Sequence, residues 1–296
     1  MTALGTYLEL VRAPAVLTVL GDTLVGRAAI GRPAGTQRAL VLLPAASACL
    51  YSAGMALNDV ADRRLDAVER PERPIPSGRI SARRAFGLGT ALTIVGLGLA
   101  AAAGGRRTLG VAVPLAACIW TYDLLAKPHP VAGPLLMGGC RGLDVLLGAG
   151  ADGASRAAGP ALAMAAHTIG VTALSRGEVH GTTRPLAAAV ATGTAVTAAL
   201  LASRRGDPAG GYRAPVVAGA LGYAARCLPA QWSATTDPSA PRAREATKQG
   251  IRAMIPLQTA LVLTGGRSGA AAFLVGVDIV GALLRARSGG RKVSET

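Results

Sequence analysis

Long apolar runs separated by short charged segments dominate this chain. Crossing a bilayer as a helix takes about 20 mostly apolar residues. Runs of that kind lie at residues 14–31, 39–57, 82–103, 108–125, 130–150, 160–178, 185–202, 213–231, 249–265 and 268–285. The eighth and ninth are the weakest, because Arg226 interrupts one and Arg252 lies near the start of the other. The pattern predicts an all-α fold, a polytopic transmembrane bundle of about nine helices, with ten as the alternative.

Composition supports this interpretation. Of 296 residues, 51% are hydrophobic and only 16% are charged, whereas soluble domains carry about 25% charged residues. The 39 glycines suit close packing of membrane helices. The first apolar run follows Arg12 and contains Asp22, so we expect it to stay as a membrane helix and not to be a cleaved signal peptide. We find no soluble domain or long low-complexity region, which predicts a single membrane-embedded domain over residues 1–296.

The net charge of +15 raises the question of nucleic acid as a partner. The arginines form short clusters between apolar runs and no continuous basic face, so we exclude that class. Clusters of this kind indicate cytoplasmic loops near anionic lipid and a phosphate-bearing substrate.

The segment 58–84 is the longest polar stretch and carries seven arginines. The positive-inside rule places it in the cytoplasm, together with the N-terminus and the loops near Lys127, 176–184 and 242–248. The basic tail at 285–292 joins them only if the number of spans is even, which favours ten. We therefore expect a multi-pass protein of the cell membrane with its active-site loops on the cytoplasmic side.

Acidic and amide side chains gather at the end of the second apolar run, in the sequence Asn58-Asp59-Val60-Ala61-Asp62-Arg63-Arg64-Leu65-Asp66. Asn58, Asp62 and Asp66 are spaced i, i+4, i+8 and so share one helical face. Oxygen ligands on one face suit Mg²⁺, which completes its coordination with water and phosphate. The alternative is a solvated helix end whose aspartates pair with neighbouring arginines.

A rigid, basic, turn-forming segment follows, Arg70-Pro71-Glu72-Arg73-Pro74-Ile75-Pro76-Ser77-Gly78-Arg79. With it the chain resembles the UbiA superfamily of intramembrane prenyltransferases. Residues 58–66 match the NDxxDxxxD signature of that family, and 73–78 match its RPIPSG stretch. The resemblance extends over essentially the whole chain, through Arg12-Ala13-Pro14 before the first run and Tyr122…Lys127 after the fourth.

The resemblance implies a helical bundle with a central cavity, in which Mg²⁺ binds an isoprenoid diphosphate and assists ionisation of its C–O bond. It implies metal ligation by the first motif, with Asn58 and Asp62 the strongest candidates for direct ligands. The remaining candidates are Asp59 and Asp66 for metal binding, Asp62, Asp66, Lys127 and Tyr122 for catalysis, and Arg63, Arg73, Arg141, Asp144 and Arg176 for substrate binding.

The second acidic motif departs from the family pattern. Most members have DxxxD near the end of the sixth helix, where this chain reads Leu174-Ser175-Arg176-Gly177-Glu178-Val179-His180-Gly181. Glu178 is the one carboxylate here and is the candidate metal ligand. The departure resembles the EboC-like branch of the superfamily, which includes UbiA-type terpene cyclases.

Polar residues elsewhere in the apolar runs are functional candidates, because they are costly in lipid. Arg141 and Asp144, spaced i, i+3, are interpreted as cavity residues, with a structural ion pair as the alternative. His167 is interpreted mainly as a hydrogen-bonded interhelical residue. Asp22, Asp123 and Asp278 stay open between pathway-lining and structural roles. The four cysteines lie in apolar runs without a CxxC pair, which predicts small buried thiols.

Two functions follow from this resemblance. In the first, the prenyl cation is transferred to a lipophilic aromatic or alcohol acceptor. In the second, the same ionisation leads to cyclisation to a terpene without an acceptor. Aromatic residues make up only 3% of the chain, which favours transfer because aromatic faces stabilise cations. The altered second motif favours cyclisation.

Overall fold

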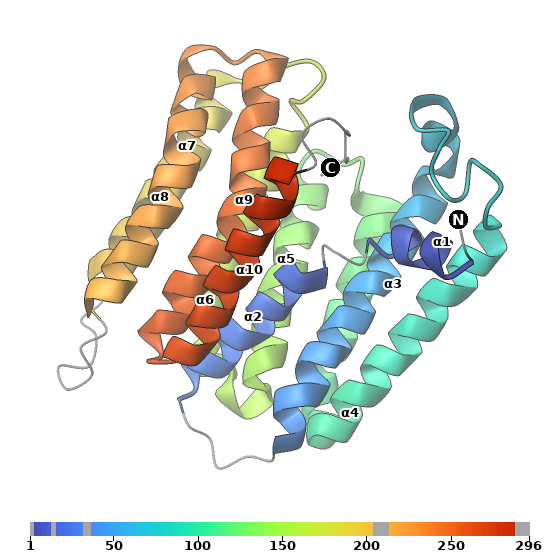
Figure 1. The fold of residues 1–296 in the computed structure, drawn as a ribbon, viewed down its shortest axis with the longest axis horizontal. Coiled ribbons are helices and arrows are strands. Elements are labelled where there is room, and N and C mark those ends of the chain that lie inside the picture. The colour runs from blue at the N-terminus through green and yellow to red at the C-terminus, as the bar shows by residue number, and fades with distance from the viewer. Residues whose placement is uncertain (1–2, 13–15, 32–36, 204–212, 288–296) are drawn as a thin grey trace. The chain divides into compact units, whose positions relative to one another are not determined.

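The structure is a computed structural model that describes residues 3–12, 16–31, 37–203 and 213–287 (Figure 1). Every regular element in these ranges is helical. The α-helices are α1 (Ala3–Leu10), α2 (Val16–Ala29), α3 (Gln37–Glu69), α4 (Ala82–Thr121), α5 (Ala132–Ala149), α6 (Ala154–Ser175), α7 (Arg184–Ser203), α8 (Arg213–Thr236), α9 (Ala240–Thr264) and α10 (Ser268–Arg287). A π-helical segment, Tyr122–Ala126, extends α4, and a short 3-10 helix, Ala151–Gly153, precedes α6.

The chain forms two compact units. The first comprises residues 1–27 and 32–161, and the second comprises 28–31 and 162–296. The first motif belongs to the first unit, and the region of Glu178 belongs to the second.

In the first unit, α4 is two antiparallel helices joined by a sharp turn. Gly104 and Gly105 leave helical geometry, and Gly105 has a φ of 64°, a conformation that glycine adopts without strain. Beyond the turn the chain returns alongside itself, because the Trp120 indole Nε1 donates to Thr93 Oγ1 at 3.1 Å and the Phe86 and Trp120 rings meet edge to face. The break that the sequence predicted between residues 103 and 108 is confirmed.

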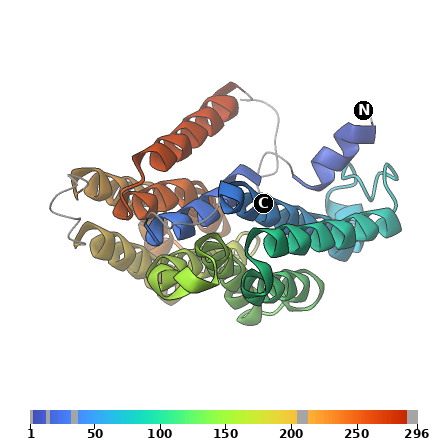
Figure 2. The ribbon, with the colours of Figure 1, turned by 90° about the horizontal axis from the view of Figure 1, so that it is seen from below.

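Small residues bring the helices of this unit together. Figures 1 and 2 both show α3 and α4 side by side. Gly89 and Gly96 of α4 lie against Leu57 and Leu50 of α3, with no room for a larger side chain at Gly96. At the crossing of α2 and α5, Gly148 lies so close to the backbone of Thr23 that a Cβ atom would overlap it. Backbone contact of this kind is how membrane helices pack.

Polar contacts between helices hold the second unit together. His167 of α6 bridges two helices: its Nδ1 is 2.9 Å from Tyr223 Oη on α8, and its Nε2 is 3.0 Å from the Gly250 carbonyl on α9. The prediction of an interhelical histidine is confirmed. Arg226 of α8 pairs with Asp278 of α10 at 3.2 Å, which accounts for the two charges that interrupt these apolar runs.

All ten predicted apolar runs are helical in the described residues. Within the part of the chain that the structure describes, four helical segments are long and apolar enough to cross a membrane, namely 38–69, 82–126, 151–175 and 184–203. The number of spans therefore stays a prediction, as does the single domain, and the basic tail at 285–292 falls largely outside the described residues. The sequence analysis did not predict α1, whose Leu10 packs with Ala56, Ile80 and Ala85.

Candidate functional site

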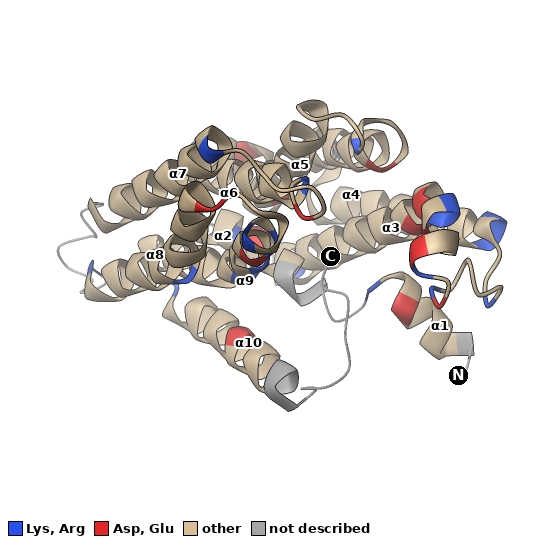
Figure 3. Cartoon of the chain, turned by 90° about the horizontal axis from the view of Figure 1, so that it is seen from above, with Lys and Arg blue, Asp and Glu red and all other residues tan. Residues whose placement is uncertain are grey.

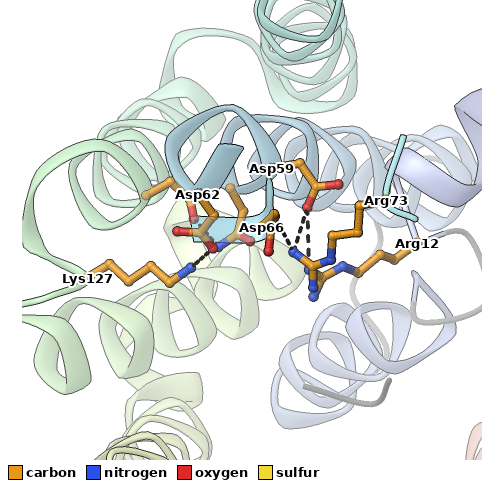
Figure 4. Close-up of polar contacts among 8 residues, drawn as sticks. Arg12, Asp59, Asp62, Asp66, Arg73 and Lys127 are labelled. Carbon is orange, nitrogen blue, oxygen red and sulfur yellow. Dashed lines mark hydrogen bonds and ion pairs between the residues drawn. The ribbon is translucent and has the colours of Figure 1, made fainter. Parts of the chain in front are cut away.

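Lysines, arginines and acidic residues gather at the C-terminal end of α3 (Figure 3). They form two neighbouring clusters. In the first, the Arg73 guanidinium lies 2.8 Å from Asp66 Oδ2 and 3.5 Å from Asp59 Oδ1, and Arg12 approaches the same Asp59 oxygen at 3.5 Å (Figure 4). Asp59 and Asp66 are spaced i, i+7 and are buried. Two carboxylates on one face of α3 thus hold two arginines.

The loop that carries Arg73 is ordered by the residues of its RPIPSG stretch. Ser77 Oγ donates to the Arg73 carbonyl at 2.6 Å, and Pro74 is buried. Gly78 has a φ of 74°, which a residue with a side chain adopts only under strain. The Glu9 carboxylate of α1 holds Arg79 by two hydrogen bonds and raises the pKa of its guanidinium above the ordinary value. The motif therefore builds a rigid turn that presents Arg73 to α3.

Among the described residues, Arg12 is the one residue other than glycine with a positive φ, which is 48°. A left-handed conformation of this kind is costly away from glycine and concentrates at functional sites. It directs the Arg12 side chain toward Asp59. The sequence analysis noted Arg12 in the family stretch before the first run but did not place it in the site.

The second cluster contains the first two oxygen ligands that the motif predicts. Lys127 Nζ is in direct contact with Asp62 Oδ2 (Figure 4). The Asn58 amide lies beside both: turned one way, its nitrogen donates to Asp62 at 3.3 Å and its oxygen accepts from Lys127 Nζ at 2.8 Å. The structure thus brings three of the candidate residues together, Asn58, Asp62 and Lys127, although 65 residues separate Asp62 from Lys127.

Asp123 joins this cluster from the π-helical segment. Its carboxylate is buried and accepts from the amide of Asn58 at 3.4 Å when that amide is turned the other way. A π-helical turn inside a helix is frequent at functional sites. The sequence analysis left Asp123 open between a pathway-lining and a structural role. Its position next to Tyr122 in an apolar run was the one signal in the sequence that pointed to the site.

Other candidates lie outside these two clusters. Arg63 is exposed and donates to the Val60 carbonyl of its own helix. Arg141 pairs with Asp22 at 3.0 Å, and Asp144 accepts from Ser47 at 2.7 Å. Arg141 thus forms an ion pair with Asp22, whereas the alternative in the sequence analysis paired it with Asp144. Tyr122 begins the π-helical segment and is half-buried. Substrate-binding roles for these residues stay predictions.

The candidate second motif lies just beyond α6, which ends at Ser175, so Glu178 is in a turn and not in the helix itself. Glu178 is half-buried, and its backbone carbonyl accepts from Arg244 of α9 at 2.9 Å. Arg176 is exposed. Both residues belong to the second unit, and their roles stay predictions.

The donor groups of the second cluster fit a magnesium ion. Within the described residues, no three histidine, cysteine or acidic side chains are grouped to hold a metal. Asn58 and Asp62 supply one amide and one carboxylate oxygen. A Mg²⁺ site that uses one or two carboxylates and completes its shell with water and substrate phosphates needs no more protein ligands.

Comparison with known families identifies the family of this chain. The model of the UbiA prenyltransferase family matches residues 19–222, which include both clusters except Arg12. The chain belongs to the UbiA prenyltransferase family. The finer resemblance to the EboC-like branch stays a prediction.

Curated members similar to this chain are named digeranylgeranylglyceryl phosphate synthase. The protein from Methanopyrus kandleri is 35% identical over 147 residues, which is 48% of this chain and 52% of that protein. The one from Ignicoccus hospitalis is 39% identical over 135 residues, which is 45% of this chain and 42% of that protein. The matched region thus spans about half the length of these relatives.

Solved structures share the fold. A UbiA homologue from Archaeoglobus fulgidus, solved with DMAPP and Mg²⁺, has a TM-score of 0.65 at 17% identity and covers 93% of this chain and 98% of its own. A structure of a digeranylgeranylglyceryl phosphate synthase has the same TM-score at 18% identity and covers 90% of this chain and all of its own. At this level of identity, the likeness supports the UbiA fold.

Proposed function

We propose that this protein is a Mg²⁺-dependent intramembrane prenyltransferase that ionises an isoprenoid diphosphate and transfers the prenyl group to a lipophilic acceptor. The observation that carries the proposal is the cluster of Asn58, Asp62 and Lys127, two oxygen ligands for a metal with a flexible cation beside them. Membership of the UbiA family supports it.

In the proposed reaction, the C–O bond of an allylic diphosphate breaks and its electron pair leaves with the diphosphate oxygen. The acceptor then forms a bond to the prenyl cation and loses a proton. Magnesium held by Asn58 and Asp62 would supply charge neutralisation for the diphosphate. Fixed positive charge placed where negative charge develops is a large source of catalysis.

We assign different roles to the residues of the two clusters. Lys127 is the candidate to donate to a diphosphate oxygen, because its long side chain can exchange one anionic partner, Asp62, for another. Asp59 and Asp66 hold Arg73 and Arg12 in place. We assign Asp59 and Asp66 the role of ordering the basic loop beside the metal site, in place of the metal binding first expected for both.

The names of the relatives favour an alcohol as the acceptor class. Their name describes a prenylated glyceryl phosphate as the product, and an ether of that kind forms when a hydroxyl group attacks the cation. The neighbours solved with DMAPP and with GPP support an isoprenoid diphosphate as donor. Both assignments are proposals for this chain, and we place the reaction at the cytoplasmic side of the cell membrane.

Cyclisation of the diphosphate without an acceptor is the second candidate. The altered second motif favours it, since the segment from Leu174 to Gly181 has Glu178 as its one carboxylate and so departs from the transferase pattern.

Product analysis separates the two functions. The purified protein in detergent is incubated with geranylgeranyl diphosphate and Mg²⁺, first alone and then with a glyceryl phosphate ether that bears a free hydroxyl group. We expect a prenylated product only when the acceptor is present. A cyclic hydrocarbon formed without acceptor would establish the cyclase instead, and release of neither product with a range of alcohol and aromatic acceptors would contradict the proposed function.

A further inference from the structure

The Asn58 amide has two orientations, and each meets a different set of neighbours. In one, the amide nitrogen donates to Asp62 Oδ2 at 3.3 Å and the oxygen accepts from Lys127 Nζ at 2.8 Å. In the other, the nitrogen donates to Asp123 Oδ1 at 3.4 Å and the oxygen takes the position facing Asp62. The first arrangement satisfies the amide without a metal.

The second arrangement is the one that suits a cation. It sets the Asn58 amide oxygen 3.3 Å from Asp62 Oδ2, with no hydrogen between two acceptors. Neighbouring oxygens around Mg²⁺ lie about 3 Å apart, since each is about 2.1 Å from the ion in an octahedral shell. The same orientation sets two donors, the amide nitrogen and Lys127 Nζ, 2.8 Å apart, so it is the less favourable one until a cation lies between the two oxygens and Lys127 withdraws.

Turning the amide oxygen toward Asp62 leaves its nitrogen in need of an acceptor. Asn58 is 8% exposed and Asp123 is 5% exposed, so water has little access, and a buried donor without a partner is costly. Among the described residues, the acceptor that the structure offers on that side is the Asp123 carboxylate.

We propose that Asp123 is a positioning residue: it accepts the Asn58 amide hydrogen and so holds the amide oxygen beside Asp62, in the orientation that binds the metal. Lys127 releases the amide as it turns. The π-helical segment and the residue that follows it thus carry a partner for each orientation, Lys127 without metal and Asp123 with it. The inference rests on the proposed function, because it requires Asn58 and Asp62 to be metal ligands.

The packing around Asp123 supports this role. Gly54 lies one turn before Asn58 on α3, and a Cβ atom there would lie 3.3 Å from Asp123 Oδ2 and 3.0 Å from Ile119 Cγ2. The carboxylate is therefore packed directly against α3, on the part of the helix that carries Asn58, where a glycine leaves room for it.

Metal affinity tests the inference without turnover. Mn²⁺ serves as the probe, and its binding to the full-length protein in detergent is measured by electron paramagnetic resonance, with and without inorganic pyrophosphate. We expect Asp123→Ala to raise the Mn²⁺ dissociation constant about tenfold, the effect of losing one hydrogen bond to a charged partner. Asp123→Asn keeps an acceptor oxygen, so its Mn²⁺ dissociation constant should stay within about threefold of the wild-type value. That change corresponds to a binding free energy near the low end of the range for a neutral hydrogen bond.

A double-mutant cycle shows whether Asp123 acts through Asn58. We expect Asp123→Ala to have no further effect on Mn²⁺ affinity in the Asn58→Ala background, since coupled residues are not additive. Ser47→Ala is the matched control, because it removes a buried side-chain hydrogen bond from the same helix, to Asp144; it should leave Mn²⁺ affinity unchanged. Should Asp123→Ala fail to fold, Gly54→Ala displaces the carboxylate while keeping it, and should weaken binding in the same direction.

The outcomes separate the inference from the proposed function. If Asn58→Ala weakens Mn²⁺ binding, three results would still overturn the positioning role of Asp123. They are wild-type affinity in Asp123→Ala, additive effects in the double-mutant cycle, and equal losses of affinity in Asp123→Ala and Asp123→Asn. Absence of Mn²⁺ binding to the wild-type protein, even with pyrophosphate, would overturn the metal site itself and the inference with it.

Discussion

Two regions with the same expected task differ sharply in what they contain. The end of α3 holds Asn58 and three aspartates, and each of the aspartates meets a cation: Arg12, Arg73 or Lys127. The turn after α6 holds a single carboxylate, Glu178, whose backbone is bound by Arg244. Each region belongs to its own compact unit.

The difference shows that the two candidate sites balance their charges in different ways. At the end of α3, basic side chains neutralise acids that would otherwise repel one another, and in the proposed mechanism Lys127 exchanges Asp62 for a diphosphate oxygen. At the turn after α6 there is one acid and thus no repulsion to relieve. We infer that the first region carries most of the metal binding and that the second contributes a single charge.

The largest effect is expected for Asp62→Asn, which removes the carboxylate while keeping its size. Turnover of geranylgeranyl diphosphate should fall about 10³-fold, at the upper end of what one electrostatic stabiliser contributes. Initial rates in detergent measure it. Asp152→Asn is the control, because Asp152 is an exposed partner of Arg107, and it should retain wild-type turnover. Loss of less than about tenfold in Asp62→Asn would remove the first region from the mechanism.

Glu178→Gln tests the second region. If Glu178 replaces the missing aspartates, turnover should fall about 10²-fold, since part of the diphosphate charge stays unneutralised. Glu245→Gln removes an exposed acid of α9 that pairs with Lys248, and should be near normal because such pairs contribute about 0–1 kcal/mol. Near-normal turnover of folded Glu178→Gln would show that the turn after α6 is only a solvated loop; Asp144 would then be the next acid to test.

The smallest effect belongs to an ion pair outside both regions. Arg226→Gln leaves Asp278 without its partner within two apolar helices, and should lower the free energy of unfolding by about 2 kcal/mol, since the pair is only partly buried. Replacing both residues by leucine should restore stability. Thermal unfolding in detergent measures both variants. A fall in turnover beyond the loss of folded protein would instead place this pair in the reaction.

The structural features that depend on the local spacing of residues could be predicted from the sequence. The ten apolar runs are helical, the break near Gly104 and Gly105 is a turn, and the motif at the end of α3 lies on a helix as its i, i+4 spacing required. The cysteines are unpaired, as predicted, although Cys49 and Cys118 are only partly buried.

The sequence could not predict contacts made between distant helices. Asp123 contacts Asn58 across 65 residues of sequence, and Arg12 contacts Asp59 across 47. The periodicity of apolar residues does not indicate which distant residues pair. The spacing of Asn58, Asp62 and Asp66 suggested one set of ligands, whereas the neighbouring cations divide the motif into two clusters. The short α1 was missed because two helical turns leave too weak a pattern beside the stronger run that follows.

Metal dependence tests the central claim most directly. Diphosphate release from geranylgeranyl diphosphate, with acceptor present, is followed in purified protein treated with EDTA and then titrated with Mg²⁺. Because the aspartates of α3 need a divalent cation to approach a diphosphate, activity should vanish with the chelator and return in full with Mg²⁺. Full activity in excess EDTA would contradict the assignment of Asn58 and Asp62 as metal ligands and the mechanism built on them.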